Sequence, residues 1–120
     1  MFKFEKLVAW QKAIGYADAV YEATSQFPGD ERFGLTSQLR RAAVSISSNL
    51  AEGNGRNTKE DYARFVGIAY GSLMETVSQL FLAERQGFLS PESFQSLYSL
   101  ADELARILSG LRSSLLKNDR

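Results

Sequence analysis

The sequence predicts an all-α protein, an antiparallel up-down-up-down four-helix bundle. Four segments repeat apolar residues at steps of three and four, and no segment alternates apolar and polar residues long enough to form a strand. Short segments containing Gly, Pro, Ser or Asn separate the four. Because short connections make neighbouring helices run antiparallel, the same pattern predicts the topology, and we expect residues 1–120 to form a single domain.

The first two helices are expected over about residues 9–26 and 35–52. Pro28 and Gly29 disfavour continuation of the first helix. Gly53 or Gly55 ends the second, because either glycine can take the left-handed conformation common at helix C-termini. The apolar faces comprise Trp10, Ala13, Ile14, Ala17, Val20 and Tyr21 in the first helix, and Leu35, Leu39, Ala42, Ile46 and Leu50 in the second.

The third and fourth helices carry start signals. Thr58 can cap the third helix, and Glu60 and Asp61 then lie at the positive end of its dipole. Ser90 can cap the fourth helix, with Pro91 at the first helical position, where its missing N–H costs little. We expect the third helix to reach about residue 86 and the fourth to run to about residue 115, each with its apolar stripe in the core.

Composition excludes several classes of function. The chain has no His and no Cys, so the usual metal, haem and iron–sulfur ligands, the thiol nucleophile and the most common proton-transfer side chain are all missing. We therefore expect no enzyme, no catalytic residue, no bound metal and no cofactor. The start of the chain lacks a secretory pattern and no run resembles a membrane span, so we expect a cytoplasmic protein with no membrane partner.

The flank of the second helix opposite its apolar side is unusual for exposed surface. It carries small residues in place of the long Lys and Glu side chains that normally cover a solvated face. A polar stripe with heptad spacing runs along it, formed by Gln38, Arg41, Ser45, Ser48 and Glu52. Such a stripe suits a hydrogen-bonded contact with another subunit, whereas the alternative is a Ser-rich helix that simply faces solvent.

Basic residues gather in the middle of the chain although 14 Lys and Arg balance 14 Asp and Glu. Any nucleic-acid site must therefore be a basic patch on part of the surface. In a ring of identical subunits each subunit repeats that patch, so a few phosphate contacts per subunit can add up to binding. The Gly-rich turn at residues 52–59 could also hold an anion at a helix N-terminus, or it could simply connect two helices. The expected nucleic-acid or anion-binding residues are Arg40, Arg41, Arg56, Lys59 and Arg64.

Several motifs in order along nearly the whole chain resemble one bacterial family, the 23S ribosomal RNA intervening-sequence proteins. They include LVAWQKA at residues 7–13, ERFGL at 31–35, QLRRAAVSI at 38–46, NLAEG at 49–53 and AYGSL at 69–73. The resemblance implies a four-helix bundle that assembles into a homopentamer, with relatives that include the accessory protein of diversity-generating retroelements. The family's characteristic polar positions here are Arg40, Arg41, Ser45, Asn49, Glu52, Gly53 and Arg56, which adds Asn49 to the expected subunit interface.

These observations predict a non-enzymatic homo-oligomer, a pentamer by the resemblance, that presents a basic surface to RNA or DNA. The usual base-stacking signatures of RNA-binding modules are missing, so we expect contacts to the backbone. The alternative is a protein-interaction scaffold that recruits a partner such as a polymerase without touching nucleic acid.

Overall fold

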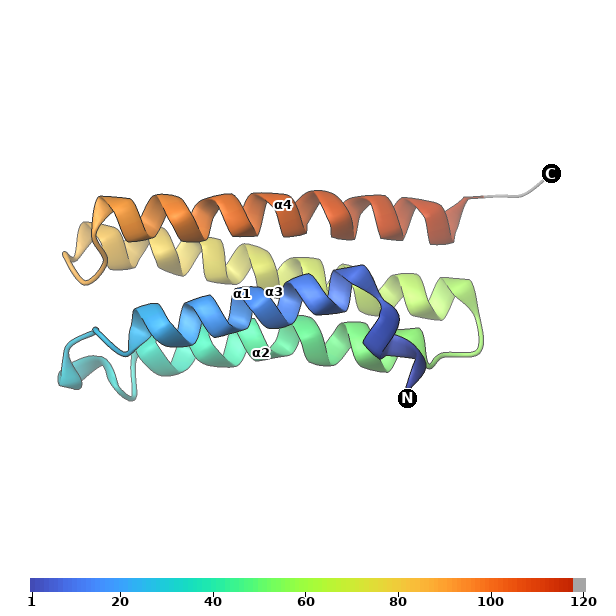
Figure 1. Ribbon diagram of the computed structural model, residues 1–120, viewed down its shortest axis with the longest axis horizontal. Coiled ribbons are helices and arrows are strands. Elements are labelled where there is room, and N and C mark those ends of the chain that lie inside the picture. The colour runs from blue at the N-terminus through green and yellow to red at the C-terminus, as the bar shows by residue number, and fades with distance from the viewer. Residues whose placement is uncertain (118–120) are drawn as a thin grey trace.

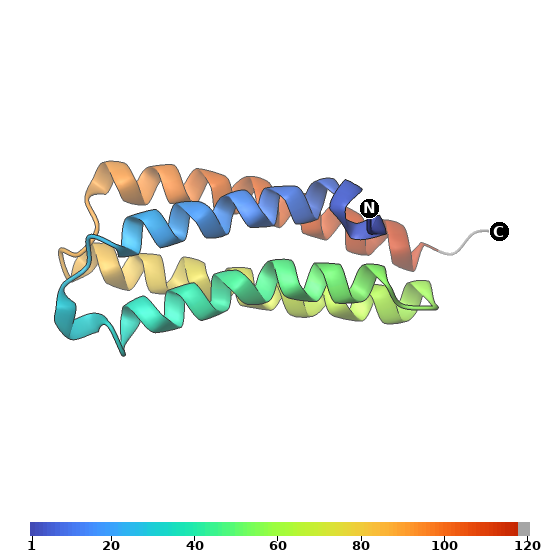
Figure 2. The same cartoon turned by 60° about the horizontal axis from the view of Figure 1, so that its bottom comes forward.

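The computed structural model describes residues 1–117 and confirms the all-α bundle. Its elements are a 3₁₀ helix η1 (Lys3–Lys6), α1 (Val8–Thr24), a 3₁₀ turn η2 (Gly29–Glu31), α2 (Leu35–Asn54), α3 (Lys59–Arg85) and α4 (Pro91–Leu116). Consecutive helices run antiparallel along a molecule of 52 × 24 × 21 Å (Figure 1). α2 lies between α1 and α3, and α4 closes the bundle against α3 and α1, as the turned view in Figure 2 also shows.

The expected helix starts are confirmed, and the second helix ends at Gly55, one of the two glycines predicted to end it. Thr58 accepts a hydrogen bond from the Asp61 amide, and Ser90 accepts one from the Ser93 amide, both at 3.1 Å. Gly53 does not end α2. It is buried inside the helix because α2 and α3 approach closely there, and a β-carbon at position 53 would lie 2.6 Å from Phe65 Cβ. Gly55, with φ −90°, ends the helix without a left-handed residue.

The core lies along the bundle axis and takes its large side chains from all four helices. The fully buried ones include Tyr16, Val20, Leu39, Ile46, Leu50, Val66, Leu73, Leu80, Leu104 and Leu108. The predicted face of α1 is confirmed at Ala13, Ala17 and Val20. Ile14 and Tyr21 are exposed, while Tyr16, which the pattern missed, is buried.

Tyr16 is tolerated in the core because its hydroxyl has a partner. Its oxygen lies 2.8 Å from Thr76 Oγ1 on α3. The Thr76 hydroxyl donates to the Leu73 carbonyl at 2.6 Å, so Tyr16 is the donor of the bond between the two side chains. A buried polar pair of this kind fixes α1 against α3 without leaving an unsatisfied group.

Replacing Tyr16 with Phe is expected to reduce the loss of stability at high pH. Burial raises the pKa of Tyr16 to about 12 from an ordinary value near 10. The unfolded chain therefore releases this proton at lower pH than the folded chain. The protonated Tyr16 side chain makes its full contribution to the free energy of unfolding below about pH 10. Between about pH 10 and 12 that free energy falls by about 1.4 kcal/mol per pH unit. Urea unfolding at about pH 8 and about pH 11 checks this, and equal losses in the two proteins would contradict it.

The middle of helix α3 carries almost no charge. Between residues 65 and 83 its only charged residue is Glu75. Within the described residues, it is long and apolar enough to cross a membrane by length and composition alone. A core helix meets the same criterion because its inner face must be apolar, and α3 packs against both α2 and α4. Its outer face is nevertheless apolar as well, with Ile68, Met74 and Leu82 exposed.

Candidate functional site

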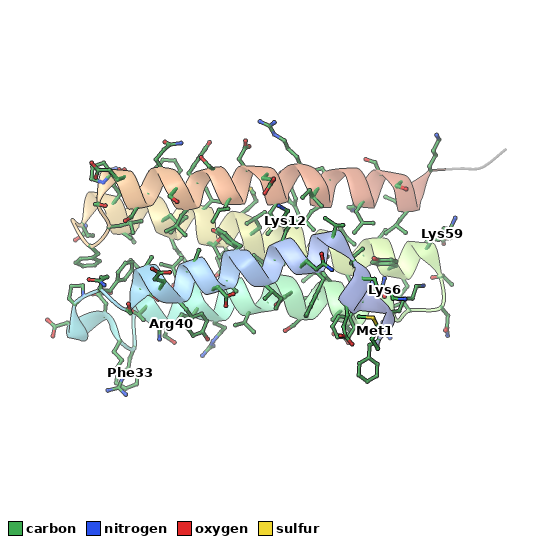
Figure 3. The ribbon with its side chains drawn as sticks, in the orientation of Figure 1. Met1, Lys6, Lys12, Phe33, Arg40 and Lys59 are labelled. Carbon is green, nitrogen blue, oxygen red and sulfur yellow. The ribbon has the colours of Figure 1, made fainter. Side chains whose placement is uncertain are left out.

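The five cations expected to bind nucleic acid do not form one patch. Arg40 lies on α2, and Arg56 lies just beyond the C-cap of that helix. The two residues are 16 positions apart in the chain, which corresponds to about 24 Å along a helix. Figure 3 shows Arg40 toward the end of the bundle that carries Phe33, and Lys59 at the opposite end. The structure therefore divides the set into Arg40 and Arg41 on α2, and Arg56, Lys59 and Arg64 around the turn from α2 to α3.

Arg40 faces the neighbouring helix α1. Its Nε donates to Thr24 Oγ1 at 2.8 Å and one terminal nitrogen donates to the Tyr21 carbonyl at 3.3 Å. Its guanidinium carbon also lies 4.6 Å from the centre of the Tyr21 ring. These contacts fasten the end of α1 to α2, so Arg40 has a structural role.

Arg41 points to the other side of α2, into a shallow polar groove of about 430 Å³ between α2 and α3. Phe33, Gln38, Ser45 and Glu75 also line this groove. Among residues 1–117, Arg41 forms no ion pair, although it shares the groove with Glu75. It therefore offers an exposed cation beside Phe33, whose side chain is 90% exposed.

Arg56 and Arg64 belong to an ion-paired network around Phe65. Arg56 lies 3.2 Å from Glu52 and 3.5 Å from Asp61, and Arg64 lies 3.0 Å from Asp61. Both guanidinium groups also rest on the ring of Phe65, at 4.5 and 4.7 Å from its centre. The network holds the α2–α3 turn in place, and its two cations and two carboxylates balance each other.

A larger basic region emerges once the topology is known. The up-down arrangement brings the N-terminal segment, the α2–α3 turn and the last turn of α4 to one end of the bundle (Figure 1). We call residues 1–7, 51–64 and 112–117 the basic end, because they carry four acids against seven cations. The seven are Lys3, Lys6, Arg56, Lys59, Arg64, Arg112 and Lys117.

The other end of the bundle has the opposite charge balance. Residues 22–34 and 82–95 carry five Asp or Glu residues against two Arg residues. The net charge of zero therefore hides a separation of charge along the long axis. Sequence reasoning missed Lys3, Lys6, Arg112 and Lys117 because it searched for cations close together in the chain. Assigning charges to the ends of the predicted bundle would have found them.

The predicted interface stripe of α2 divides into two halves. Gln38 accepts from Gln79 at 3.3 Å, the Ser45 and Ser72 hydroxyls are 2.9 Å apart, and Asn49 donates to the Ser45 carbonyl at 2.8 Å. Those residues therefore have partners within the chain. The other half of the stripe is exposed and consists of Arg41, Ser48 and Glu52.

Exposed apolar side chains lie beside this half of the stripe. Val44 is 42% exposed on α2 between Arg41 and Ser48. On α3, Ile68 and Leu82 are 42% and 50% exposed and lie seven residues to either side of Glu75, which places them on one helical face. We call this surface the α2–α3 face, and it consists of Phe33, Arg41, Val44, Ser48, Glu52, Ile68, Glu75 and Leu82.

The part of the chain that the structure describes holds no group of three or more acidic side chains that could bind a metal ion. The candidate site is a surface, made of the basic end and the α2–α3 face. Its chemistry is that of directed cationic donors, small polar groups and exposed apolar side chains.

Comparisons with known proteins agree with this fold. A family model described as 23S rRNA-intervening sequence protein matches residues 5–110. A crystal structure of a protein of unknown function from the S23 ribosomal protein family of Bacteroides thetaiotaomicron VPI-5482 is similar, with a TM-score of 0.77 and 22% identity over 92% of this chain and 100% of that one. At this identity the likeness shows the fold alone. No curated protein matches the chain.

Proposed function

The chain belongs to the 23S rRNA-intervening sequence protein family, and from this membership and the surface described above we propose a homo-oligomer whose basic end binds the backbone of RNA or DNA. The protein acts by binding and catalyses no reaction. The separation of charge along the bundle axis is the observation that carries the proposal. A locally positive surface attracts nucleic acid even where the whole chain is neutral, because screening limits each charge to about 10 Å.

Amine-reactive labelling of the lysines tests the nucleic-acid contact, because the chain contains an internal control. Lys3, Lys6, Lys59 and Lys117 belong to the basic end. The fifth lysine, Lys12, lies outside it and forms an ion pair with Glu103 at 3.5 Å. We expect structured RNA to slow labelling of the four basic-end lysines, measured by mass spectrometry, and to leave Lys12 unchanged. Equal protection of all five, or of Lys12 alone, would contradict the proposal.

The oligomer is proposed to form through the α2–α3 face. Two features support this: its large apolar side chains are exposed, and Arg41 and Glu75 are unpaired with each other across a shared groove. Contact with a sister chain would bury these side chains and bring opposite charges together. Five copies follow the family resemblance. In a closed ring the basic ends of several subunits would act together on one nucleic acid.

Light scattering at micromolar concentration tests the assembly. We expect a particle of several chains, and a monomer would contradict the proposal. The double variant Ile68→Asp and Leu82→Asp is expected to shift the protein toward monomer. Leu100→Asp is the matched control, because Leu100 is a similarly exposed leucine on α4 at 40% exposure. Equal dissociation by the control would contradict the assignment of the α2–α3 face.

A second candidate function is supported by an aromatic cluster on α3 and α4. Phe81 lies 4.9 Å from Phe94 and 6.2 Å from Tyr98, measured between ring centres, and both Phe81 and Tyr98 are exposed. Exposed aromatic clusters are common anchors of protein partners. Here the bundle would be a scaffold that recruits a protein such as a polymerase. Recovery of such a partner after nuclease treatment, and its loss in Phe81→Ser, would favour this function.

A further inference from the structure

A second groove lies between α3 and α4 near the basic end. Its volume is about 400 Å³, which is the size of a small ligand site. The floor is apolar, because Leu108 is fully buried. The residues lining it are Gly67, Tyr70, Leu108, Ser109, Arg112 and Ser113.

Arg112 lies against Gly67 of α3. A β-carbon at position 67 would lie 3.4 Å from Arg112 Nε, which is an ordinary van der Waals contact, so only a side chain larger than that of alanine would crowd the arginine. Among residues 1–117, no group accepts a hydrogen bond from Arg112 and no acid pairs with it. Arg106 on the same helix is different, since it lies 2.8 Å from Asp102.

The other polar groups around the groove are also without partners in the described chain. The hydroxyls of Tyr70, Ser109 and Ser113 make no side-chain hydrogen bond, and the Tyr70 ring packs on no other aromatic ring among residues 1–117. Tyr70 is 36% exposed. The groove thus combines a guanidinium, three hydroxyls and an uncovered aromatic ring above an apolar floor.

These groups match the two parts of a nucleotide. Arg112 and the serine hydroxyls can donate to phosphate oxygens, and a guanidinium can do so with two parallel hydrogen bonds. The Tyr70 ring can stack on a base, but only on one that is not already stacked within a duplex. We propose that this groove holds an unpaired nucleotide of a bound single strand, with its base on Tyr70 and its phosphate on Arg112. This inference rests on the proposed binding of nucleic acid at the basic end.

Fluorescence anisotropy with a labelled single-stranded oligoadenylate and a labelled duplex of the same length tests the inference. Tyr70→Ala is expected to weaken binding of the single strand by at least about fivefold and to leave duplex binding unchanged. Arg112→Gln is expected to reduce the slope of log affinity against log salt by about 0.7 for the single strand, since one phosphate contact is lost. Arg106→Gln, which removes the same charge from the same helix, should leave that slope unchanged.

The binding experiment distinguishes a wrong assignment of the groove from a wrong assignment of the basic end. If wild type binds both probes and the Tyr70 and Arg112 variants behave like Arg106→Gln, the groove is not a nucleotide site although the basic end binds nucleic acid. If wild type binds neither probe at low salt, both proposals are rejected. Gly67→Leu fills the groove while keeping all charges, and it should weaken single-strand binding without changing the oligomeric state. A changed oligomeric state would overturn the inference, because the groove would then be a subunit contact.

Discussion

Leu39→Ala is expected to lower the free energy of unfolding by about 2 to 5 kcal/mol, which is a large share of the stability of a typical domain. Leu39 is fully buried on α2, the helix that packs against both α1 and α3. Truncation removes apolar contact and leaves a cavity that the rigid bundle cannot close. Urea unfolding followed by circular dichroism at one fixed protein concentration measures the change, because association also contributes to apparent stability.

Arg56→Ala, just beyond the C-terminal end of α2, is the control for this measurement. Its ion pairs with Glu52 and Asp61 are exposed, and such pairs contribute at most about 1 kcal/mol. The expected loss is therefore much smaller than that of Leu39→Ala. If both variants lowered the free energy of unfolding equally, the assignment of Leu39 to the core and of Arg56 to the binding surface would be wrong.

The fold could be predicted because its determinants are local. The apolar spacing that marks α2, and the caps at Thr58 and Ser90, act within one or two helical turns and are readable directly from the chain. The predicted face of α1 was less accurate. Tyr16 is polar at its tip, and only its partner Thr76, sixty residues away, makes it a core residue.

The binding surface could be predicted only in part, because it depends on contacts between distant segments. Arg40 was expected at the surface and instead contacts Tyr21 and Thr24, a pairing that requires α1 and α2 to be in register. The basic end joins Lys3, Lys6 and Lys117 from the two ends of the chain. No local pattern marks these lysines as neighbours. They come together because successive helices of the bundle alternate in direction.

The central claim is that the basic end holds nucleic acid through phosphate contacts, and a salt titration of binding to structured RNA tests it most directly. Four or more phosphate contacts give a slope of log affinity against log salt of about −3 or steeper. We therefore expect affinity to fall by roughly a hundredfold when salt is raised about fourfold from a low starting concentration. Detectable binding at low salt with that steep loss is the predicted result. Absence of binding at low salt, or binding that salt does not weaken, would contradict the account.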